Sequence, residues 1–105
     1  MLLSVRGVVW YWRGPAPFYF VTVPAPESKQ IKGIERQVTY GWGMIPVVVR
    51  IGDTDYATAL WPKDGRYIVP IKAQVRRQEG IEEGDEVVLS LEVTPPLGGD
   101  FTPAR

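Results

Sequence analysis

The chain of 105 residues contains no cysteine and no histidine. The absence of cysteine excludes disulfide frameworks, thiolate nucleophiles and zinc sites with cysteine ligands. The absence of histidine removes the commonest general base, the commonest metal ligand and the Ser–His and Cys–His nucleophile pairs. Catalysis would therefore have to use carboxylates, Lys, Arg or Tyr, and the sequence shows no catalytic constellation. We predict no metal site and no cofactor, and the residue content favours binding over catalysis.

The sequence also lacks any apolar run near the roughly 18 residues needed to span a bilayer. Its first residues show no basic segment, no continuous apolar stretch and no small-residue cleavage site, so they do not resemble a signal peptide. We therefore expect a cytoplasmic protein with no membrane partner. The composition, 45% hydrophobic and 23% charged, is that of a globular protein. We predict one domain over residues 1–94 and a loose tail over residues 95–105.

Positive and negative side chains are equal in number but unevenly placed along the chain. Residues 1–78 carry 11 basic and 5 acidic side chains, whereas residues 79–105 carry 1 basic and 7 acidic. One interpretation is a basic face that attracts an anionic partner. The favoured interpretation is a solvated surface of interleaved signs, because charge runs mostly serve solubility. In a closed sheet, the last strand could also lie beside the first and cancel the separation.

Six segments have the apolar, β-branched and alternating composition of strands. They span residues 2–12, 18–23, 44–51, 54–61, 66–71 and 86–94. Turns rich in Gly, Pro and Asp separate them, and two short helices are indicated near residues 25–34 and 72–79. The pattern predicts a mainly β fold, a small closed or nearly closed antiparallel barrel of about six strands with one or two short helices. Closure would remove the exposed edges of such apolar strands.

Four signatures occur in order along this pattern. They are FYFVTVP at 18–24, GWG at 41–43, TALWP at 58–62 with GRY at 65–67, and KAQVRR at 72–77 with GIEEGDEV at 80–87. Together they resemble the domain of unknown function 1905 family of small bacterial and archaeal proteins, over roughly residues 2–94. The resemblance implies a small β-barrel. It also implies that some relatives add a bacteriocin-protection segment of the YdeI/OmdA type, which we do not find here, and it implies no activity or catalytic residue.

Aromatic side chains are the main evidence for a binding role. The chain has four Trp, five Tyr and three Phe. A barrel core of this size holds about half of them, because each buries on the order of 150–250 Å². We expect the rest to line a pocket, a surface patch or an interface. The glycines around Trp42 indicate a close approach of backbone to a strand or, less favoured, to a ligand.

Two polar clusters have both a functional and a structural interpretation. The basic residues Arg66, Lys72, Arg76 and Arg77 could form a groove for an anion, or a short helix could simply show its charged side to water. The second interpretation is favoured. Asp53 and Asp55 could act as paired carboxylates, but in a hairpin turn such residues are far more often turn formers.

We predict a non-enzymatic module that binds a small ligand or a protein partner through an aromatic-lined barrel mouth or surface. The candidate binding residues are Trp42, Trp61, Tyr67, Arg66 and Arg76. The alternative is a binder of single-stranded nucleic acid or of an anionic ligand, which would use the basic residues before position 78. A carboxylate-dependent enzyme is the least favoured class. The sequence leaves the ligand and the oligomeric state open.

Overall fold

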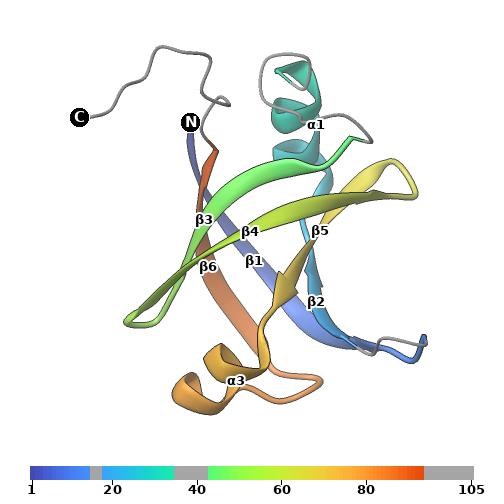
Figure 1. Cartoon of the computed structure of the whole chain (residues 1–105). Coiled ribbons are helices and arrows are strands. Elements are labelled where there is room, and N and C mark those ends of the chain that lie inside the picture. Colours follow the sequence, from blue (N-terminus) through green and yellow to red (C-terminus); the bar gives the residue numbers. More distant parts are fainter. Residues whose placement is uncertain (15–17, 35–42, 94–105) are drawn as a thin grey trace.

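The computed structural model describes residues 1–14, 18–34 and 43–93, and within these ranges it contains six strands and two helices. The strands close into an antiparallel barrel in the order β1-β2-β5-β4-β3-β6 (Figure 1). The elements are β1 (Leu2–Trp12), β2 (Phe18–Thr22), α1 (Ala25–Gly33), β3 (Ile45–Ile51), β4 (Thr54–Lys63), β5 (Arg66–Ile71), α3 (Ala73–Glu79) and β6 (Glu86–Val93). The predicted fold class is therefore confirmed, while the predictions for Trp42 and for the tail 95–105 concern residues outside the described ranges.

The two longest strands each belong to both halves of the barrel. Strand β1 pairs with β6 from Leu2 to Val8 and with β2 from Val9 to Trp12. Strand β4 likewise pairs first with β3 and then, from Trp61, with β5. Gly7 lies next to the point where β1 changes partner, and a Cβ there would be 2.7 Å from Val21 Cγ1. Strand β1 therefore approaches β2 too closely here for a larger side chain.

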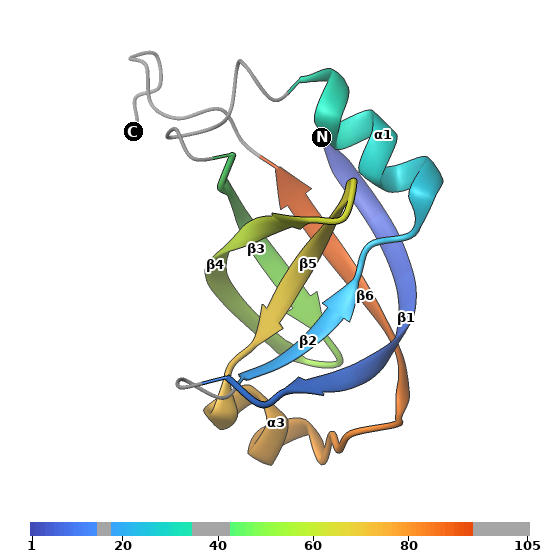
Figure 2. The same cartoon turned by 90° about the vertical axis from the view of Figure 1, so that its right-hand side faces the viewer.

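The core is almost entirely aliphatic, with Tyr67 as the one aromatic side chain in the described cluster of buried residues. Alternate residues of the strands point inward, as the period of a strand dictates. They include Leu3, Val5 and Val9 of β1, Val47 and Val49 of β3, and Leu89, Leu91 and Val93 of β6. Ile31 of α1 and Val75 of α3 belong to the same cluster. The two helices lie at opposite ends of the barrel (Figures 1 and 2), so each end is covered by a helix that packs into the core.

The backbone conformations of the turns are those that their Gly and Asp residues favour. Asp64 and Gly65 both have positive φ values, 51° and 80°, which is the conformation of a tight two-residue hairpin. Gly80, with φ 65°, ends α3 in the left-handed conformation that favours glycine. Pro62, which we expected in the turn, instead continues β4 opposite Tyr67. The β3 ladder ends at Leu60, so this proline lies where β4 has one neighbour only, a position at which a strand tolerates proline.

The two helices are short. Helix α1 has nine residues and α3 has seven. Within the described part of the chain, no helix is long and apolar enough to cross a bilayer.

Candidate functional site

Large aromatic side chains gather on the outside of the barrel. They are Trp10, Trp12, Phe18, Phe20 and Trp61, and we call this group the aromatic face. Because the odd-numbered residues of β1 and β2 point into the core, the even-numbered ones point outward. The ladder places Trp10 opposite Phe20 and Trp12 opposite Phe18. The strands β2 and β5, over which the aromatic face extends, face the viewer in Figure 2.

The rings form one continuous cluster, with Trp61 as the link to β4. The Trp61 ring centroid lies 5.1 Å from that of Phe20, 5.8 Å from Phe18 and 6.3 Å from Trp12. The interplanar angles are 62°, 76° and 72°, which are edge-to-face arrangements. Edge-to-face pairs stabilise by about 0.5–1.5 kcal/mol each beyond their buried area. The aromatic face is therefore an organised layer rather than a set of separate exposed rings.

This layer has a buried floor and an exposed rim. Phe20 is fully buried although it points away from the core, and Ile68 beneath the same layer is buried as well. Trp12 and Phe18 keep 38% and 39% of their surface exposed. Trp10 is oriented by its Nε1 hydrogen, which it donates to Thr22 Oγ1 at 3.0 Å. Water thus meets two large rings that are already held in place by their neighbours.

Cationic side chains border the aromatic face at the β4–β5 hairpin. The Lys63 Nζ atom lies 5.9 Å from the centroid of the Trp12 ring. Lys63 and Arg66 line a cavity of about 310 Å³ together with Trp10, Thr22, Asp64 and Ile68. Both also line a second cavity of about 330 Å³ on the side of the hairpin that faces α1, to which Lys29 and Lys32 contribute. The hairpin therefore carries positive charge into both hollows.

The outer surface of the other half of the barrel has a different character. We call it the mixed face, and it consists of Arg6, Val48, Arg50, Asp55, Glu86 and Val88. Here exposed aliphatic side chains alternate with ion pairs. Arg50 Nη1 lies 3.1 Å from Asp55 Oδ1, and Arg6 Nη1 lies 3.8 Å from Glu86 Oε1. The aspartate that the sequence offered as half of a carboxylate pair is thus engaged by an arginine.

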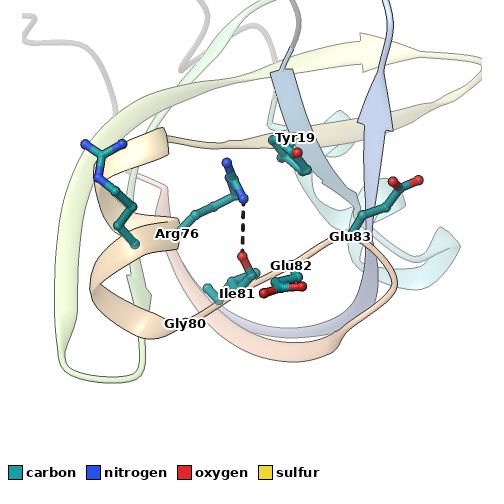
Figure 3. A pocket seen from close by; sticks show the side chains of 7 residues that line it. Tyr19, Arg76, Gly80, Ile81, Glu82 and Glu83 are labelled. Carbon is teal, nitrogen blue, oxygen red and sulfur yellow. Dashed lines mark hydrogen bonds between the residues drawn. The ribbon is translucent and has the colours of Figure 1, made fainter.

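Arg76 lies at the α3 end of the barrel, in an open hollow of about 600 Å³ (Figure 3). Its guanidinium carbon is 3.6 Å from the centroid of the Tyr19 ring. Its Nη1 donates to the carbonyl oxygen of Ile81 at 3.3 Å, while its buried Nε has no partner among the described residues. Glu82 and Glu83 line the same hollow and offset the positive charge. The contacts of Arg76 hold the segment after α3 against the barrel.

The five residues predicted for the site therefore divide between different places. Trp61 lies in the aromatic face and Arg66 lies beside it. Tyr67 is 3% exposed and belongs to the core, where its ring packs inside the barrel. Arg76 is on α3, at the opposite end of the barrel from the β4–β5 hairpin (Figure 1). Trp42 is outside the described residues.

Sequence reasoning missed Trp10, Trp12, Phe18, Phe20 and Lys63 as members of one surface. A signal was present, since aromatic residues recur at every second position on both sides of the first turn. In two strands joined by a hairpin, such residues share one face when their registers match. What the sequence could not supply was the position of Trp61, which reaches this face across β5.

Tyr56 and Glu79 make polar contacts that join elements of the barrel. Burial raises the pKa of Tyr56 well above its usual value, and its hydroxyl donates to the carbonyl oxygen of Pro70 at 2.9 Å. Glu79 of α3 accepts hydrogen bonds from the Thr54 hydroxyl at 2.6 Å and from the Asp53 amide at 3.3 Å. It therefore braces the β3–β4 turn. Within residues 1–14, 18–34 and 43–93, no group of three or more acidic, histidine or cysteine side chains is placed to hold a metal ion.

Comparison with known proteins bears on the whole barrel rather than on the aromatic face alone. No curated protein matches the chain. A family model described as a domain of unknown function, DUF1905, matches residues 6–91. This range runs from β1 into β6 and includes both helices. The chain therefore belongs to the DUF1905 family.

Proposed function

We propose that this domain is a non-enzymatic binding module and that the aromatic face is its binding surface. The observation that carries the proposal is the pair of half-exposed rings, Trp12 and Phe18, supported by a buried aromatic floor. Contiguous exposed apolar patches usually mark interaction sites. Aromatic residues also supply much of the energy at such sites, because they bury a large area with few rotatable bonds.

The surface, rather than a barrel mouth, is the better location for this role. The interior is filled by aliphatic side chains, and α1 and α3 contribute Ile31 and Val75 to that packing. A ligand would have to displace core residues to enter. The aromatic face needs no such rearrangement, since its rim is already exposed and its rings are already positioned.

The neighbouring charges favour a negatively charged partner that also has a planar or apolar part. Lys63 lies directly beside the Trp12 ring, and Arg66 lines the adjoining cavity. A cation next to an apolar platform would bind an acidic group while the ring packs against the rest of the partner.

The proposal can be tested by following the tryptophan indole signals in NMR spectra during titration. The panel would contain nucleotides, oligonucleotides, acidic peptides and aromatic fragments. We expect shifts confined to Trp10, Trp12 and Trp61, and we expect them to disappear in the double variant Trp12→Ala, Phe18→Ala. The matched control is Val48→Ala, Val88→Ala, which removes two exposed apolar side chains from the mixed face.

Binding that maps to the mixed face, or that survives unchanged in the aromatic double variant, would contradict the proposal. So would a complete absence of shifts across the panel. The amide spectrum of each variant serves as the check on folding, because a change in the barrel would move signals throughout the protein.

A further inference from the structure

Positive side chains outnumber negative ones beside the aromatic face, whereas the two signs are mixed on the mixed face and at the α3 end of the barrel. The aromatic face is bordered by Lys63 and Arg66, with Lys29 and Lys32 across the hairpin. The described acidic residues near it are Asp64, which pairs with Lys63 at 3.2 Å, and Glu27 of α1. The described acidic side chains from Glu79 onward lie on α3, on the segment after it and on β6. Strand β6 pairs with β1 and β3, not with β2 or β5, so these charges belong to the other half of the barrel.

We propose that the occupant of the aromatic face is single-stranded nucleic acid. The inference rests on the proposed function and names the class of partner for the same surface. Proteins that bind single strands combine a positively charged groove for the backbone with aromatic rings on which bases stack. Here Trp12 and Phe18 supply the exposed rings, and Lys63 and Arg66 supply the adjacent cations.

The arrangement of the cations suits an extended polyanion better than a compact anion. Lys63 and Arg66 line the hollows on both sides of the β4–β5 hairpin, and Lys29 continues the positive charge toward α1. A strand crossing the hairpin would keep its phosphates near cations along its length. Bases at one end of the crossing would reach the exposed rings, because Lys63 lies only 5.9 Å from the Trp12 centroid.

Two other occupants fit the same surface less well. A symmetric dimer through this surface would bring Lys63 and Arg66 of one copy close to those of the other, because the same patch meets itself in such a contact. A nucleic-acid duplex keeps the flat surfaces of its bases stacked on one another, where Trp12 and Phe18 could not reach them. A single strand presents those surfaces directly.

The test is fluorescence anisotropy with a labelled ten-nucleotide oligothymidine at 50 and 200 mM NaCl. We expect Trp12→Ala, Phe18→Ala to weaken binding on the order of tenfold to a hundredfold through lost stacking. We expect Lys63→Ala, Arg66→Ala to weaken binding and to flatten its salt dependence. For the unmodified protein, the higher salt concentration should weaken binding roughly twentyfold if about three phosphates are neutralised.

The matched control is Arg6→Ala, Arg50→Ala, which removes the same charge from the mixed face. We expect it to leave affinity within about twofold, because exposed charges beyond a screening length act weakly. If Arg6→Ala, Arg50→Ala lowered the affinity as much as Lys63→Ala, Arg66→Ala, the attraction would be diffuse and the inference would be overturned. Equally tight binding of an abasic oligonucleotide would also overturn it, because no base would then be stacked.

A labelled acidic peptide with interspersed tryptophans separates this inference from the proposed function. If the peptide binds at Trp12 and Phe18 while the oligothymidine does not, the nucleic-acid inference fails and the binding surface stands. If neither binds and the wider panel is also silent, the binding function itself fails.

Discussion

The two outer faces of this barrel share strands β1 and β4 but differ in how they expose apolar surface. On the mixed face, Val48 and Val88 are exposed singly among ion pairs such as Arg50–Asp55. On the aromatic face, five rings touch one another and bury Phe20 completely. Scattered exposed aliphatic residues are ordinary on protein surfaces, whereas a continuous layer is not. This comparison indicates that an outer surface can contain a second small hydrophobic cluster that buries one ring completely and leaves others partly exposed.

The largest expected effect comes from the floor of the aromatic face. Phe20→Ala should lower the free energy of unfolding by about 3–5 kcal/mol, as truncation of a buried phenylalanine does in a core. Urea denaturation followed by circular dichroism measures this loss. Val48→Ala on the mixed face is the control, with an expected change within about 0.5 kcal/mol. A loss below that of the control would show that the aromatic layer contributes nothing to stability.

The packing of β1 against β2 can be disturbed at Gly7, next to the point where β1 changes its pairing partner. An added methyl group would lie 2.7 Å from Val21 Cγ1 and 3.3 Å from the carbonyl oxygen of Thr22. Gly7→Ala should therefore destabilise by about 1–3 kcal/mol through overpacking. The midpoint of thermal unfolding reports the change. Gly33→Ala is the matched control, because a methyl group there meets nothing within 4 Å, and it should not destabilise.

A smaller effect on stability is expected at the rim. Trp12→Ala should cost about 1–2 kcal/mol, less than Phe20→Ala, because the tryptophan is already partly exposed and loses less buried surface. The same variant should have the stronger effect on binding. Denaturation and ligand titration of Trp12→Ala and Phe20→Ala would show whether the exposed and the buried ring have these separate roles. Equal effects of the two variants on stability and on affinity would contradict this prediction.

The smallest effect is expected on the mixed face. Arg50 and Asp55 form an exposed ion pair with more than half of each side chain in water. Arg50→Ala should change the free energy of unfolding by no more than about 0.5–1 kcal/mol, because solvent and salt screen such pairs. Denaturation at low and high salt measures it. A loss of stability as large as that of Gly7→Ala would mean that the ion pairs of this face contribute substantially to the stability of the fold.

Much of the barrel could be predicted from the sequence because its strands alternate clearly. In β6, Leu89, Leu91 and Val93 are buried while Val88 and Glu92 are exposed, as the period-two pattern requires. The Asp-Gly turn was equally legible, since Asp64 and Gly65 adopt the backbone conformation that this pair favours. Local rules were sufficient at these places.

The candidate site was harder to predict because it depends on strand order. Every residue of β5 after Arg66 is buried, so alternation cannot show that Tyr67 points into the core while Ile68 lies under the aromatic layer. Trp61 meets Phe18 and Phe20 only because β5 lies between β2 and β4. The position of Arg76 against Tyr19 likewise depends on how α3 docks at the end of the barrel. None of these contacts is local in sequence.

The pairing of β1 with β6 has a consequence for how the chain folds. The amide of Val93 donates to the carbonyl oxygen of Met1 at 2.8 Å, and the amino group of Met1 donates back at 3.0 Å. Closure of the barrel thus joins residues separated by nearly the whole described chain, and contacts of such long range slow the search for the native state. We expect folding on a timescale of about milliseconds to seconds rather than microseconds. Until this seam closes, β1 and β6 each keep an open edge that can pair with another molecule, so the protein is prone to misassembly during that interval.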